Sequence, residues 1–150
     1  MDTSSILSKI RKIRDEDSWT SHVKDYMSNL HNYEVYYDDV MRKIAIEAEL
    51  RPCCLDSDSD LNEDAYYMVS TAGVFPGDRA VQIIHKDLGG NGCTFNAVPW
   101  NAKVDLSAWE NSKEMIYNHL KRPNTTARMF YAFEYDYKTE DDFSRPSTVL

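Results

Sequence analysis

Two segments of the chain alternate apolar and polar side chains with the period of a β-strand, and they constrain the fold more than any other feature. In residues 33–50, two such runs flank the acidic pair Asp38–Asp39, which predicts a hairpin of two strands with a polar turn. In residues 128–137, Met, Tyr or Phe occupies every second position. Alternate side chains of a strand lie on one face of its sheet. We therefore expect a small antiparallel sheet.

The clearest predicted helix covers residues 104–120. Trp109 and Leu120 fall on one face of this helix, as in an amphipathic helix that packs on a core. Ser107 and Glu110 have the spacing of a capping box, which predicts that the Ser107 side chain closes the first turn.

Shorter patterns fill the remainder of the chain. Residues 65–74, 79–86 and 94–98 are predicted strands, and Pro99 is expected to end the last of them. A sharp loop is predicted where three glycines cluster in residues 89–92. The expected fold class is α+β.

The N-terminal region has helical rather than strand periodicity. Apolar side chains in residues 6–13 and again in residues 19–30 are spaced as helical faces. We therefore divide the chain into an N-terminal helical cap, residues 1–32, and a main domain, residues 33–150. The main domain ends in an acidic tail that begins at Glu140.

Charge and composition narrow the classes of partner. The net charge of −8 disfavours tight binding of nucleic acid, because phosphate contacts need clustered Lys and Arg, and it favours a protein partner. A bound divalent cation could still supply local positive charge. No run of 18 apolar residues is present, so no membrane association is expected.

The cysteines indicate the compartment. The chain has three of them, two being the adjacent pair Cys53–Cys54, which makes a poor disulfide framework and favours a reducing, cytoplasmic setting. No secretory signal is recognised at the N-terminus. The spacing of Cys and His does not match a structural zinc motif.

Four blocks of sequence, taken in order, resemble the DNA/RNA non-specific endonuclease family. The blocks are Tyr33–Asp38 with Arg42, Gly77–Ile84 followed by Leu88-Gly89-Gly90, Phe95–Trp100, and Asp105–Trp109. They resemble the family's opening hairpin, its catalytic strand and Gly-Gly loop, its Asn-x-x-Pro-Gln segment, and the start of its metal-binding helix. The resemblance implies a ββα-metal-like core.

The position that the resemblance gives to the general base does not hold a base. In this family a His on the catalytic strand activates water. With the Gly-Gly loop as anchor, that position is Gln82, and the preceding Gly is Val81. The carboxamide of Gln82 does not titrate near neutral pH. His85, three residues further on, faces away from Gln82 along an ideal strand and could replace the base only if a bulge turned it.

The implied metal site is altered as well. The family's Asn ligand for Mg²⁺ is Asp105 here, which is an acceptable oxygen donor. The supporting Glu is Lys113, whose charge opposes a cation. Asn96 matches the family and is expected to order the loop beside the site, and Arg79 could contact a phosphate.

The sequence therefore predicts a degenerate nuclease-like domain that binds a protein, or a nucleic acid weakly, without cutting it. Two alternatives stay open. The first is an active Mg²⁺-dependent endonuclease that uses Asp105 for the metal and His85 as the base. The second is an acidic decoy that mimics nucleic acid, with its carboxylates in residues 56–64 and 134–142.

Overall fold

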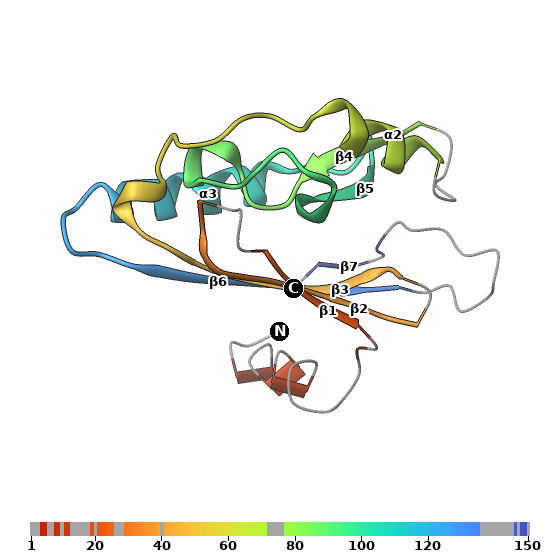
Figure 1. The fold of residues 1–150 in the computed structure, drawn as a ribbon, viewed down its shortest axis with the longest axis horizontal. Helices are drawn as coiled ribbons and strands as arrows, with labels where there is room; N and C mark the ends of the chain where they lie inside the picture. Colours follow the sequence, from red (N-terminus) through yellow and green to blue (C-terminus); the bar gives the residue numbers. More distant parts are fainter. Residues whose placement is uncertain are drawn as a thin grey trace.

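The computed structural model describes residues 4–5, 8–9, 11–12, 19, 21–25, 29–39, 41–71, 77–135, 146 and 148–149. A five-stranded antiparallel sheet forms one layer, and two helices with a separate two-stranded sheet lie together on one of its faces (Figure 1). The strand order is β1 (Ser21–Asp25), β2 (His31–Tyr37), β3 (Lys43–Leu50), β6 (Ala127–Glu134) and β7 (Thr148–Val149). The predicted α+β class with a small antiparallel sheet is confirmed.

The predicted hairpin in residues 33–50 is formed by β2 and β3. Its turn depends on Asp38, whose carboxylate accepts hydrogen bonds from the backbone N–H and from Nε of Arg42, each at 2.8 Å. Met41 takes a positive φ of 63° in this turn, where no glycine is present. The side chains of Tyr33 and Val35 are fully buried, as their alternation predicts.

The second layer contains the β–β–α order that the resemblance implies. Strand β4 (Asp78–Gln82) pairs antiparallel with β5 (Ala97–Asn101), and α3 (Ser107–Leu120) follows. β4 ends at Gln82 rather than at residue 86, and short 3-10 helices η2 (Lys86–Leu88) and η3 (Thr94–Asn96) lie between the strands. Pro99 does not end its strand but lies within β5, opposite Ala80. It is tolerated there because the outer edge of β5 has no partner strand among the described residues.

Helix α3 packs on the core through the predicted face. The indole of Trp109 stacks on Tyr131 of β6 with 5.5 Å between ring centroids, and its Nε1 donates to the carbonyl of Ile83 at 3.3 Å. The predicted capping box is wrong. The side chain of Asp105, rather than that of Ser107, accepts a hydrogen bond at the start of the helix, and its donor is the backbone N–H of Ser107.

Of the residues predicted as a strand at 65–74, those up to Thr71 form a helix instead, α2 (Glu63–Thr71), and residues 72–74 lie outside the described residues. The side chain of Asn62 accepts a hydrogen bond from the N–H of Ala65 at 3.0 Å, which satisfies a donor of the first turn. Glu63 and Asp64 place negative charge at the positive end of the helix dipole. These terminal signals outweigh the strand propensity of the apolar run.

The second predicted N-terminal helix, in residues 19–30, is also wrong. Residues Ser21–Asp25 form β1, which pairs with β2 along its whole length. The described residues of the first predicted helix, 8–9 and 11–12, are helical, as are residues 4–5 before it, and they lie on the sheet face opposite α3 (Figure 1). Lys9 forms an ion pair with Glu134 there at 3.1 Å.

The acidic segment from Glu140 lies outside the described residues, but the chain beyond it returns to the sheet, where Val149 pairs with Phe133. No described helix combines the length and the apolar character needed to cross a membrane. The largest fully buried side chains lie mainly on facing elements of the two layers. They are Tyr33, Val35, Ile46, Leu50, Cys54, Ile83, Ile84, Leu88, Asn96, Val98 and Leu120.

Candidate functional site

Gln82, which the resemblance places at the general-base position, ends β4 and bonds to the loop that follows. Its Nε2 donates to the carbonyls of Ser59 at 2.9 Å, Gly90 at 3.2 Å and Asn91 at 2.9 Å. Its Oε1 accepts from the N–H of Lys86 at 3.1 Å. Both the nitrogen and the oxygen of the carboxamide thus form hydrogen bonds with backbone groups. The side chain thereby connects the glycine loop to the segment before α2.

Asn96 is the second polar residue that stabilises the same loop. Its side chain is 0% exposed. Nδ2 donates to the carbonyls of Ile84 and Asn91, and Oδ1 accepts from the N–H of Ile84, all at 2.8 Å. Asn96 and Gln82 share the carbonyl of Asn91 as an acceptor. The structure therefore brings these two predicted residues together, in bonds to backbone.

The contacts of His85 lie within the turn that follows β4. It precedes η2, and its Nδ1 accepts a hydrogen bond from the N–H of Asp87 at 3.1 Å. The same nitrogen lies 3.4 Å from the Asp87 carboxylate. This imidazole is therefore directed at its own turn.

Asp105 precedes α3, and Arg79 of β4 contacts the residue before it. Oδ1 of Asp105 accepts from Ser107 Oγ at 2.6 Å and from Ser107 N at 2.9 Å. These hydrogen bonds lower the pKa of Asp105, so the exposed carboxylate is ionised. Arg79 donates to the carbonyl of Val104 at 3.4 Å, one residue before Asp105.

Lys113 replaces the acidic helper and is itself neutralised by acids. Its Nζ lies 2.9 Å from Glu110 and 3.7 Å from Asp87. The hydrogen bond to Glu110 raises the pKa of Lys113, which keeps the amine charged. Of the positions that the resemblance assigns to the metal, only Asp105 offers an anionic oxygen, so these residues do not fit the implied Mg²⁺ site.

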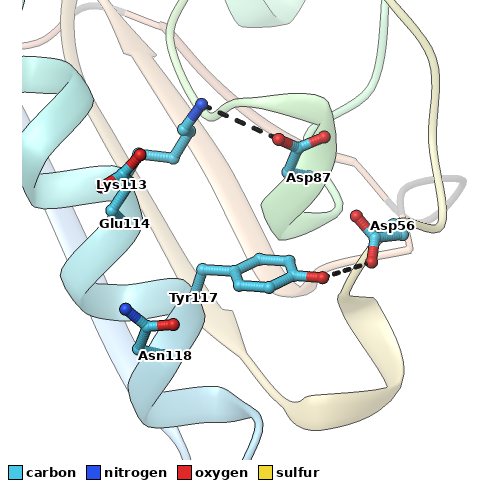
Figure 2. Close-up of a pocket in the computed structure, with 6 residues that line it drawn as sticks. All are labelled: Asp56, Asp87, Lys113, Glu114, Tyr117 and Asn118. Atoms are coloured by element: carbon cyan, nitrogen blue, oxygen red, sulfur yellow. Dashed lines mark hydrogen bonds and ion pairs between the residues drawn. The ribbon is translucent and has the colours of Figure 1, made fainter.

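A groove beside α3 has a volume of about 380 Å³. We call it the acidic groove (Figure 2). It is lined by Asp56, Asp87, Lys113, Glu114, Tyr117 and Asn118. Three carboxylates face one ammonium group there, which leaves the groove negative.

The walls of the acidic groove are tied together. The hydroxyl of Tyr117 donates to Asp56 at 2.6 Å, across the groove (Figure 2). The backbone N–H of Asp56 donates to the carbonyl of Asp87 at 2.9 Å. Sequence reasoning missed this site because Asp56 and Tyr117 are 61 residues apart. Its one sequence signal is the acidic run that begins at Asp56.

A carboxylate pair lies on β2 and β3, where Glu34 and Glu47 are directly opposite one another. The hydroxyl of Tyr36 lies 3.0 Å from Glu34 and 2.9 Å from Glu47. Burial, with the adjacent Glu47, raises the pKa of Glu34. Burial acts in the same direction on Glu47, but hydrogen bonds with Glu34, Tyr36 and Arg128 outweigh it and lower the pKa of Glu47. These surroundings therefore favour ionisation of Glu47 over ionisation of Glu34.

Comparisons of the chain with protein-family models, curated proteins and solved structures found no match. The nuclease assignment therefore rests on the four blocks of sequence.

Proposed function

We propose that this chain is a non-catalytic, nuclease-like module that acts by binding a protein. The observation that carries this proposal is the hydrogen bonding of Gln82. The residue at the position of the general base cannot titrate, and its carboxamide is engaged by four backbone groups. A side chain used in this way is not available to activate water.

The nature of the partner follows from the acidic groove. Asp56, Asp87 and Glu114 concentrate negative charge on a protein whose net charge is already −8. Such a surface repels phosphate and attracts Lys or Arg side chains, which also speeds the encounter of the two molecules. We therefore propose a basic protein segment as the ligand, with nucleic acid as the less favoured one. The cysteine content favours a reducing compartment, and we place the module in the cytoplasm.

Charge reversal in the groove tests this binding. We expect Glu114→Lys to weaken binding of a fluorescent Lys-rich peptide about threefold or more, because an exposed attraction becomes a repulsion. Fluorescence anisotropy at low and at physiological salt measures the change. Glu63→Lys is the matched control, since it makes the same change of charge on an exposed residue of α2.

A single-stranded DNA oligonucleotide is titrated in parallel. The proposal predicts that it binds more weakly than the peptide at both salt concentrations. Equal losses of peptide affinity in Glu114→Lys and Glu63→Lys would show that the groove is not the binding site. Tighter binding of DNA than of peptide would favour the nucleic-acid alternative.

A further inference from the structure

Two thiols and an imidazole converge at one end of the β2–β3 hairpin. The ligand atoms of His31, Cys53 and Cys54 all lie within 4.8 Å of one another. A tetrahedral zinc ion with Zn–S bonds of about 2.3 Å holds its ligand atoms roughly 3.5–3.8 Å apart, so small side-chain rotations would close the set around an ion. No other group of three or more His, Cys, Asp or Glu residues in the described ranges is compact enough to hold a metal.

The hairpin topology produces this convergence. His31 begins β2 and is paired with Glu49 near the end of β3. The chain leaves β3 at Leu50 and turns at once into the 3-10 helix η1 (Pro52–Cys54). The two cysteines therefore lie beside the histidine although 22 positions separate His31 from Cys53 in the sequence. The spacing rule for zinc motifs could not detect a site that is assembled by strand pairing.

The surroundings of Cys54 fix its thiol. The sulfur donates to the carbonyl of Asn29 at 3.4 Å and accepts from the N–H of Arg51 at 3.5 Å. The side chain of Asn29 also donates to the carbonyl of Ser57 at 2.9 Å, which ties the approach to β2 to the segment after η1. Gly89 packs so closely that an added Cβ would lie 2.9 Å from Cys54 Cβ. The ligands are thus held on a rigid part of the fold.

His31 differs from the other histidines in its contacts. His22 lies 3.8 Å from Glu34, His85 accepts from Asp87, and His119 lies 3.1 Å from the carbonyl of Thr126. In the part of the chain that the structure describes, the imidazole of His31 makes no hydrogen bond or ion pair with a side chain or with the backbone. Its ring nitrogens are therefore available to a metal ion.

We propose that His31, Cys53 and Cys54 bind Zn²⁺. Thiolate and imidazole are the ligands that zinc prefers, and three protein ligands leave the fourth tetrahedral position for a water molecule. Cys53 is exposed, so the cluster can be reached from solvent. The site lies apart from the positions that the nuclease resemblance assigns, and it does not depend on the proposed function.

Cobalt substitution tests the site on the full chain with its thiols kept reduced by a phosphine. Titration with Co²⁺ is expected to give a thiolate-to-cobalt charge-transfer band and the intense visible bands of tetrahedral cobalt, saturating at one ion per chain, and Zn²⁺ is expected to displace it. Cys53→Ser and His31→Gln should lose these bands or weaken Zn²⁺ binding at least about tenfold, since even outer-shell changes cost that much.

Cys93→Ser is the matched control, because it removes an exposed cysteine that lies outside the cluster. It should bind cobalt as the unaltered protein does. Circular dichroism checks that each variant is folded, and Cys53→Ser changes an exposed side chain, as the control does. Absence of the charge-transfer band in the unaltered protein, or identical cobalt spectra for Cys53→Ser and Cys93→Ser, would overturn the proposal.

Discussion

Replacing Asn96 with alanine is expected to lower the free energy of unfolding by about 3–5 kcal/mol, because buried hydrogen-bonding groups are left without partners. The N–H and the carbonyl of Ile84 both bond to this side chain at 2.8 Å. Asn96 is fully buried, so water cannot replace the lost bonds. The carbonyl of Asn91 keeps a hydrogen bond from Gln82, which limits the loss.

Urea denaturation followed by circular dichroism measures this effect. Asn111→Ala is the matched control, since Asn111 is exposed on α3, and its effect should stay within about 0.5 kcal/mol. A loss below about 1 kcal/mol for Asn96→Ala would mean that the loop is not held by these bonds.

Gly90→Ala is expected to destabilise the protein by about 3 kcal/mol or more, because it forces an atom into a packed backbone contact. A Cβ at this position would overlap the carbonyl of Ile84 and lie 2.9 Å from Nδ2 of Asn96. The carbonyl of Ile84 cannot move away without breaking its bond to Asn96. The substitution therefore opens the loop that Gln82 and Asn96 close.

Gly77→Ala separates this steric effect from the general effect of removing a glycine. Gly77 has a positive φ of 84°, and no heavy atom of the described residues lies within 4 Å of an added Cβ. Its substitution should cost about 1–2 kcal/mol, from the left-handed conformation alone. Thermal and urea unfolding of the two variants side by side give the comparison. Equal losses of unfolding free energy in the two variants would show that the close approach at Gly90 does not contribute to stability.

The elements that were predicted correctly from the sequence are those with a clear local periodicity. Alternation places Tyr33 and Val35 in the buried face of β2, and helical spacing places Trp109 and Leu120 on the inner face of α3. Over runs of this length, a strand and a helix would bury different positions. The four side chains named here are the ones that the structure packs in the core.

Two predicted elements are wrong, and each was assigned from local sequence alone. The first is a short apolar run, whose type periodicity cannot decide. The run after Asn62 is a helix because Asn62 caps it and two acids occupy its first turn. Residues Ser21–Asp25 are a strand because β2 offers them an open edge, which is a non-local property. Helical spacing in residues 19–30 could not reveal that edge.

The candidate site was predictable only in part, for the same reason. The resemblance selected Gln82, Asn96 and Asp105, but it could not show that the first two hydrogen-bond to the backbone of one loop. The acidic groove and the His31 cluster are assembled from segments that are distant in the chain. No local sequence pattern predicts such sites, because they are formed by tertiary contacts.

The most direct test of the account is a cleavage assay of the purified protein. Supercoiled plasmid DNA and RNA are incubated with it, with Mg²⁺ or Mn²⁺ and with a chelator, beside an Asp105→Ala variant. Gln82, at the base position, is bonded to backbone groups, and Lys113 replaces the Glu that would support the metal. We therefore expect the unaltered protein to cut neither substrate faster than the Asp105→Ala variant does. Metal-dependent cleavage that disappears in Asp105→Ala would contradict the account and make His85 the first base to test.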